Sequence, residues 1–278
     1  MGRLENPVLK RELKDRIRGG RFLRSIAIRV VLLGFIFYLV LLSRLGKGLL
    51  AFILAEAVLI LLYTPGAIHD AFASNAGRGQ IRELTLTRLS PRAILLGKFA
   101  GASFYNLIII LISALAMFRI WLFCGGFHLW RLVYANLALL ILLYASAVIS
   151  LAFSSMFRRS TLIPAILAYT LILLLMGSIV AAGPVIDGMD NPRAKTVMIT
   201  LALYANPLVM ASRTLGTIDI MRTEYMYRIA DPIAGRGFTY PNWYFAAIIY
   251  FTISCALLLP VYLRFSRIRR SPDPLVSV

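Results

Sequence analysis

The chain has 278 residues, of which 60% are apolar and only 15% are charged, and its mean hydropathy is +0.80. A soluble domain carries roughly 25% charged residues because its surface faces water, so this composition excludes an ordinary soluble protein. The net charge of +18 does not indicate nucleic-acid binding, because the basic residues stand between apolar runs and not on one soluble face. The two cysteines and two histidines have no partners at metal-ligand spacing, which argues against a metal site.

Residues 1–25 form a basic N-terminal segment, and within it NPVLKRELKDRIRGG (residues 6–20) has the pattern of a short amphipathic helix. Its opening Asn-Pro suits an N-cap and a first helical position, and its closing Gly-Gly suits a helix end. Three apolar residues at spacing i, i+4 and i+8 make a narrow stripe among basic residues: Leu9, Leu13 and Ile17. Apolar burial and anionic lipid hold such helices at the membrane interface. The segment serves either as an anchor alone or as an anchor that also contacts a cytoplasmic partner.

Six apolar runs are long enough for membrane spans, since a helix needs roughly 20 mostly apolar residues to cross a ~30 Å hydrocarbon layer. Arg29 lies near the start of the first run, where its long side chain can snorkel toward the interface. Ser90-Pro91 is a strong start signal for the third, with serine as N-cap and proline at the first helical position. The predicted spans are about Ile26–Leu42, Leu49–Ile68, Pro91–Phe118, Leu132–Phe153, Leu162–Ala182 and Trp243–Leu263.

A seventh apolar stretch, Val197–Met210, is short and is broken by Asn206-Pro207. A run of 10–14 apolar residues favours an interfacial or re-entrant piece over a span. With six spans and the N terminus inside, the basic residues of the short loops divide 20 inside against 4 outside, whereas a seventh span would put the basic residues of 264–270 outside. We therefore expect an all-α bundle of six spans at 26–264, an extracytoplasmic insertion at 183–241 and a cytoplasmic tail at 265–278.

The cytoplasmic loop at 69–92, between the second and third predicted spans, is too polar to enter lipid and too long for a tight turn. Within it, residues 80–89 could form a short helix that carries Arg82, Glu83 and Arg88. A short charged helix joined to two spans suits docking to a soluble protein. By composition alone, a solvated loop is an equally good interpretation.

Two stretches of the N-terminal region resemble those of type-2 ABC exporter permeases. NPVLKRELKDRIRG, which leads into the first predicted span, is similar to their interfacial elbow helix. RELTLTRLSPRAILLGKFAGA (residues 82–102) is similar to their segment after the second span. The residue-level similarity covers about the first 105 residues. It departs from the family at SNAGRGQ (residues 74–80), where many relatives carry an acidic-basic-acidic cluster.

The resemblance implies a permease half that pairs with a second, like or unlike, permease subunit and with two cytoplasmic ABC ATPase subunits. It implies a multi-pass protein of a prokaryotic plasma membrane (inner membrane), in contact with lipid and not with nucleic acid, with both termini cytoplasmic. ATP and magnesium are expected on the partner ATPase, and no cofactor is expected in this chain. The cargo is unidentified, and amphipathic or lipid-like molecules are candidates. The residues expected to contact the ATPase are Ile81, Arg82, Glu83, Leu84 and Arg88.

The chain contains no GxxxxGK[ST], GxSxG or HExxH motif, so it is not expected to be an enzyme. Glu56 lies near the middle of the second predicted span, where an acidic residue costs on the order of 2.5–3.5 kcal/mol, so it should face protein or water. It is a candidate pathway or subunit-contact residue, or it makes a structural hydrogen bond to a group such as Asn106 or Asn136. Two other functions remain open: an ion- or proton-coupled transporter that uses Glu56, and a membrane scaffold without transport.

Overall fold

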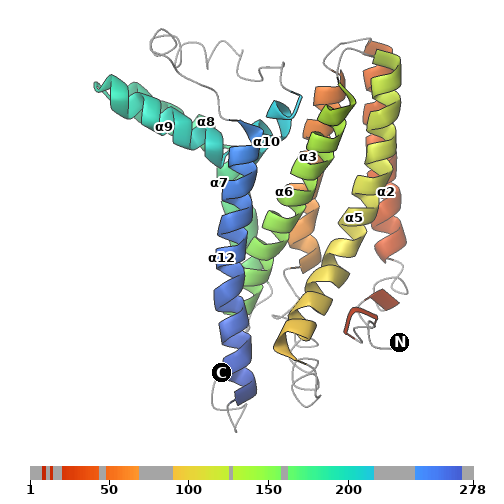
Figure 1. Ribbon diagram of the computed structural model, residues 1–278, viewed down its shortest axis with the longest axis vertical. Helices are drawn as coiled ribbons and strands as arrows, with labels where there is room; N and C mark the ends of the chain where they lie inside the picture. The colour runs from red at the N-terminus through yellow and green to blue at the C-terminus, as the bar shows by residue number, and fades with distance from the viewer. Residues whose placement is uncertain are drawn as a thin grey trace.

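The computed structural model describes residues 8–10, 13–14, 21–43, 48–68, 90–124, 128–157, 162–215 and 242–270. These ranges are almost entirely helical and contain no β-strand, which confirms the predicted all-α class (Figure 1). The helices are α2 (Arg21–Ser43), α3 (Gly48–Ile68), α5 (Pro91–Cys124), α6 (Leu129–Met156), α7 (Leu162–Met176), α8 (Ser178–Asp187), α9 (Pro192–Ala205), α10 (Pro207–Arg213) and α12 (Trp243–Arg270).

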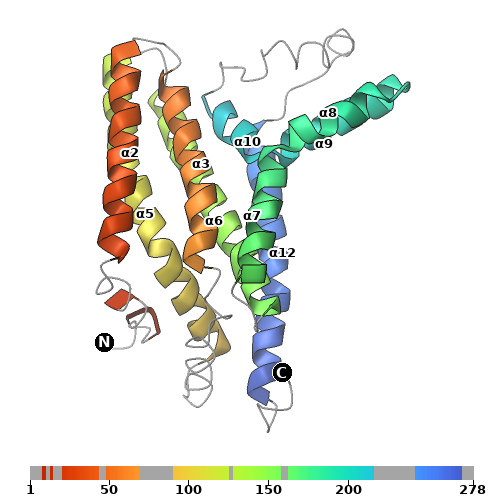
Figure 2. The ribbon, with the colours of Figure 1, turned by 180° about the vertical axis from the view of Figure 1, so that it is seen from behind.

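Helix α6 lies at the centre of the bundle, and α3, α5, α7 and α12 pack against it (Figures 1 and 2). Small side chains on a membrane helix let neighbouring backbones approach closely. The buried hydroxyls among them are satisfied within the helix, since Ser146 donates to the Leu143 carbonyl at 3.1 Å and Ser150 to the Ser146 carbonyl at 2.7 Å. The buried small residues of α6 include Ala135, Ala138, Ala145, Ser146, Ala147, Ser150 and Ala152.

Four described helical segments are long and apolar enough to cross a membrane: α3, residues 106–123 of α5, α6, and residues 243–263 of α12. Two pairs of bent helices, α7 with α8 and α9 with α10, pass the same test when each pair is taken together. The apolar part of α2, Ile26–Val40, is shorter. Large apolar side chains such as Phe35, Leu115 and Phe251 are exposed on the outside of the bundle, where lipid replaces water. The chain is therefore a helical membrane protein with four to six candidate spans among the described residues.

Two sharp bends distinguish the structure from straight spans. The stretch Leu162–Ala182, expected as one helix, is divided at Gly177 into α7 and α8, which meet at a 60° bend. Helices α9 and α10 meet at an 80° bend at Asn206-Pro207, where the sequence predicts a break. Proline has no N–H for the preceding turn and readily occupies a first helical position, so α10 starts at Pro207 in a new direction.

Helices α8 and α9 pack side by side as a hairpin that projects away from the other helices (Figures 1 and 2). The side chain of Asn191 caps α9 by accepting a hydrogen bond from the Arg193 N–H at 3.0 Å. The hairpin has a small apolar core with the start of α10, formed by Ile186, Ile199, Leu203 and Val209. We call the end of the bundle from which it projects the hairpin end. The opposite end, where α2 and α5 begin and α12 finishes, is the predicted cytoplasmic end (Figure 1).

Candidate functional site

Two oppositely charged side chains lie inside the bundle, Glu56 on α3 and Arg29 on α2. Both have no exposed surface. They sit within or beside the main apolar core, which includes Phe52, Ile53 and Ile60 of the same α3. A charge placed among apolar side chains at membrane depth is costly, so each must be compensated by partners from the protein.

Arg29 turns inward and contacts two other helices. Its Nη1 donates a hydrogen bond to Oδ1 of Asn106 on α5, and its guanidinium carbon lies 5.0 Å from the centre of the Tyr63 ring on α3. A charged hydrogen bond and a cation–π contact both strengthen when water is excluded. The expectation that Arg29 snorkels toward the interface is therefore wrong, because the bundle itself provides its partners.

The amide of Asn106 extends this contact to a second residue of α3. Its Nδ2 donates to Oγ1 of Thr64 at 2.9 Å, and the Thr64 hydroxyl donates to the Ile60 carbonyl at 2.6 Å. Because Oδ1 accepts from Arg29 while Nδ2 donates to Thr64, the amide orientation is fixed by its partners. Arg29, Tyr63, Thr64 and Asn106, which we call the Arg29 cluster, thus connect α2, α3 and α5.

The carboxyl of Glu56 is buried without a direct hydrogen bond among the described residues. The positive charge of Arg29 acts on it, but neither of its oxygens has a hydrogen-bond partner among the described residues. The hydrogen bond to Asn106 or Asn136, one of the alternatives left open by the sequence, is not formed. The Asn106 amide bonds to Arg29 and Thr64, and the amide nitrogen of Asn136 donates to the Leu132 carbonyl at 2.8 Å.

Chemically, this arrangement is an interhelical hydrogen-bond chain through Arg29 and Asn106, with the buried carboxyl of Glu56 within the electrostatic reach of Arg29. The described ranges hold no group of three or more His, Cys, Asp or Glu residues that could bind a metal ion. The arrangement can hold three helices in register, and Glu56 is also the kind of intramembrane acid that ion-coupled transporters use.

Val8, a residue of the N-terminal segment outside the predicted stripe, packs at the predicted cytoplasmic end. Val8 is 4% exposed and packs in a second apolar core, whereas Leu9 and Leu13 are only partly buried. Val8 is an apolar residue beside Leu9 in the sequence, but it lies outside the i, i+4, i+8 stripe that predicts a lipid-facing side. The other buried members of this core come from the ends of α3, α5, α6 and α12: Ile68, Ile94, Leu95, Ala147, Leu151, Ala152 and Val261.

The remaining predicted contact residues fall outside the described ranges. The whole predicted docking helix at 80–89 lies there, and so does Ile17 of the N-terminal stripe. The two helix ends that flank the loop are described: Ile68 ends α3 and Pro91 begins α5. Ser90 accepts a hydrogen bond from the Ala93 N–H at 3.2 Å, as expected of an N-cap.

A second polar junction lies at the base of the hairpin, where the two bends meet. Nδ2 of Asn206 donates to the Met176 carbonyl at the end of α7 at 2.7 Å. Its Oδ1 accepts from the N–H groups of Leu208 at 2.9 Å and Val209 at 3.3 Å, which caps α10. One buried side chain therefore satisfies backbone groups on both sides of the junction, as a buried break between helices requires.

The chain matches no model of a known protein family and no curated protein sequence.

Proposed function

We propose that this chain is the permease subunit of an ATP-driven ABC exporter, with its ATPase on a separate polypeptide. The observation that carries the proposal is the order of elements along the chain. Val8 of the N-terminal segment packs on the helix ends, and a hairpin with a bent helix lies between α7 and α12 in the chain, at the opposite end of the bundle. The N-terminal elbow and the outer-face helices of type-2 exporter permeases occupy the same places in their chains. The six spans would then be α3, α5, α6, the α7–α8 pair, α12 and α2, although the apolar part of α2, Ile26–Val40, is shorter than the other spans.

The charge distribution supports an orientation with both termini in the cytoplasm. Arg24 and Arg92 are exposed near the starts of α2 and α5, at the same end of the bundle. Arg92 lies over the Tyr262 ring of α12, with its guanidinium carbon 5.6 Å from the ring centre. Arginines at this end agree with the excess of basic residues in the short loops that the sequence predicts to be cytoplasmic.

The contacts inside the bundle suggest how motion at the ATPase would reach the membrane. The predicted docking segment at 80–89 is joined to the end of α3 and the start of α5. The Arg29 cluster joins both of these helices to α2. A displacement of the loop by a bound ATPase would therefore move three helices together and would change the opening between two permease subunits.

The proposal is tested with the chain purified in nanodiscs together with the ATPase subunit that co-purifies with it. Arg82→Ala combined with Glu83→Ala should lower ATP-driven transport about tenfold or more, the effect of losing a few polar contacts worth roughly 1.4 kcal/mol in total. Insertion should be unchanged, because neither residue enters the bilayer. Arg119→Ala, which removes an exposed arginine near the far end of α5, is the matched control and should transport normally. A purified, correctly inserted chain with no ATPase partner would refute the proposal.

The buried Glu56 favours one second candidate, an ion- or proton-coupled transporter. An acid with two unpartnered oxygens among the described residues is the feature such a transporter would need. The two functions differ in their energy source. Transport that persists without nucleotide and stops when the ion gradient is collapsed would favour the coupled transporter, whereas transport that needs ATP at zero gradient would favour the exporter.

A further inference from the structure

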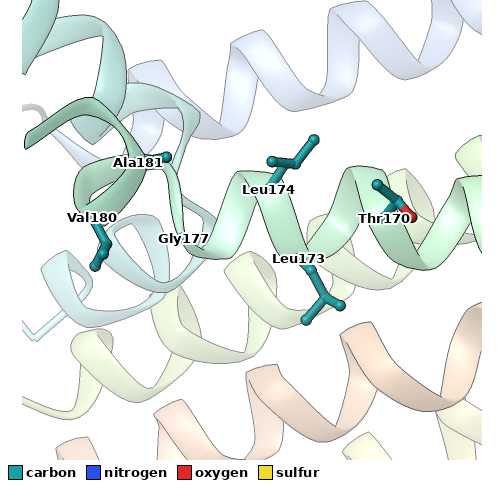
Figure 3. Close-up of a pocket in the computed structure, with 6 residues that line it drawn as sticks. All are labelled: Thr170, Leu173, Leu174, Gly177, Val180 and Ala181. Carbon is teal, nitrogen blue, oxygen red and sulfur yellow. The ribbon is translucent and has the colours of Figure 1, made fainter. Parts of the chain in front are cut away.

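The bend between α7 and α8 leaves an open groove of about 400 Å³ on the outside of the bundle. Figure 3 shows its six lining residues around the bend at Gly177, and the large ones are well exposed, with Val180 at 70% and Leu174 at 58%. The lining contains one hydroxyl and no charged group. It is formed by Thr170, Leu173, Leu174, Gly177, Val180 and Ala181.

The groove is held open by hydrogen bonds that fix the bend. Asn206 holds the last carbonyl of α7, at Met176, and the Ser178 hydroxyl at the start of α8 donates to the Ala202 carbonyl of α9 at 2.8 Å. Helix α8 therefore cannot straighten without losing contacts on both sides of Gly177. A preformed site binds a ligand with less loss of conformational freedom than one that must open.

Helix lengths place the groove within one leaflet of the bilayer. The 15 residues of α7 rise about 22 Å, and the 10 residues of α8, inclined by 60°, rise about 8 Å more. The pair thus just crosses a hydrocarbon layer of ~30 Å when α7 runs along the membrane normal. Thr170 lies about 12 Å along α7, so the groove extends through the half of the layer toward the hairpin end.

We propose that this groove binds one acyl chain of a phospholipid in the leaflet at the hairpin end. At that depth the available ligand is hydrocarbon, and the lining is hydrocarbon apart from the Thr170 hydroxyl. Residues 170, 173, 174 and 177 follow one another along one face of α7, so the groove runs parallel to a lipid chain. The proposal rests on the α7–α8 pair crossing the membrane, and it does not depend on an ATPase partner.

The size of the surface argues against a second copy of this chain as the occupant. Stable protein interfaces use about 20–30 residues on each side, whereas six residues line this groove. A single acyl chain needs no larger surface than the groove provides, because it is apolar throughout and is already confined to the bilayer.

The test uses the wild-type protein in nanodiscs that contain a phosphatidylcholine with a photoreactive group on its acyl chain. After excess lipid is removed with detergent, the retained probe should label residues 170–181 about tenfold more than the lipid-facing residues of α12 around Phe251. Val180→Trp fills the groove and should reduce this labelling about tenfold. The matched control is Val185→Trp, which changes an exposed valine of the same helix outside the groove and should leave labelling unchanged.

Three results would overturn the proposal. Equal labelling of the groove and the α12 face would mean that only the bulk lipid is present. Equal labelling of the Val180→Trp and Val185→Trp proteins would mean that the retained lipid lies elsewhere. Protection of the groove in a dimer, with exposure in the monomer, would assign it to a second copy of the chain.

Discussion

The side chain of Asn206 should control the stability of the hairpin, because it hydrogen-bonds to backbone groups at two helix ends, the last carbonyl of α7 and the first N–H groups of α10. Asn206→Ala removes the cap of α10, which costs about 0.5–2 kcal/mol. It also leaves the Met176 carbonyl without its donor, which costs about 1–3 kcal/mol for a group away from water. Together the two losses lower the free energy of local opening by about 1.5–5 kcal/mol.

Asn206→Ser separates the two contributions. Serine is a good N-cap, so the cap of α10 is kept, but the shorter side chain does not reach Met176. We therefore expect the free energy of local opening to fall only by the cost of leaving the Met176 carbonyl without a donor, about 1–3 kcal/mol. Hydrogen exchange measured by mass spectrometry follows such local opening, and each 1.4 kcal/mol corresponds to a tenfold faster exchange. The peptide that contains residues 207–213 should therefore exchange on the order of 100-fold faster in Asn206→Ala, and less so in Asn206→Ser.

A peptide from the central helix α6 serves as the internal control, since it has no hydrogen bond to Asn206 and should exchange at the wild-type rate. If residues 207–213 keep their wild-type protection in Asn206→Ala, the junction is held by packing and the hydrogen-bond argument is incorrect. If α6 is affected as strongly as α10, the substitution destabilises the whole bundle and does not act locally.

Three further predictions concern orientation, the buried charges and the N-terminal segment. Cysteine labels at positions 271 and 190 (Ser271→Cys and Asp190→Cys) should react from opposite sides of the membrane, and reaction from one side would contradict the six-span orientation. Arg29→Leu should lower the free energy of unfolding measured by detergent titration by about 1–3 kcal/mol, because it leaves the buried Oδ1 of Asn106 without its donor; unchanged stability would contradict this role. Val8→Asp should detach the N-terminal segment, seen as faster exchange of residues 8–14, and unchanged exchange there would refute its seating.

The sequence predicted the elements that depend on neighbouring residues. Long apolar runs became the long helices, Ser90 caps α5, and Asn206-Pro207 breaks α9 from α10. Each of these features follows from local backbone chemistry, because a cap, a proline or an apolar run acts within a few residues. The bend at Gly177 was not predicted, since one glycine within an apolar run is a weak signal and the contacts that fix the bend come from α9 and α10.

The polar contacts of the interior could not be predicted in the same way. The partner of Arg29 is 77 residues away on α5, and the partner of Asn206 is 30 residues away on α7. A sequence shows that a buried arginine or carboxylate needs a partner, but not which of the many polar residues the packing brings within reach. The sequence alone therefore predicts that Arg29 reaches the interface, because no neighbouring residue indicates that Asn106 packs against it.

One exposed face of α9 predicts how the hairpin would lie in a membrane. Arg193, Val197 and Leu201 follow at spacing i, i+4 and i+8, so they lie on the same face, and all three are exposed. A helix that lies flat at the interface separates polar and apolar residues onto opposite faces. Here a single exposed face changes from charged to apolar along the axis toward the C-cap Asn206, so we expect α9 to descend obliquely from the membrane surface into the apolar layer. The sequence left interfacial and re-entrant placements open for this stretch, and the exposed face argues for the re-entrant one.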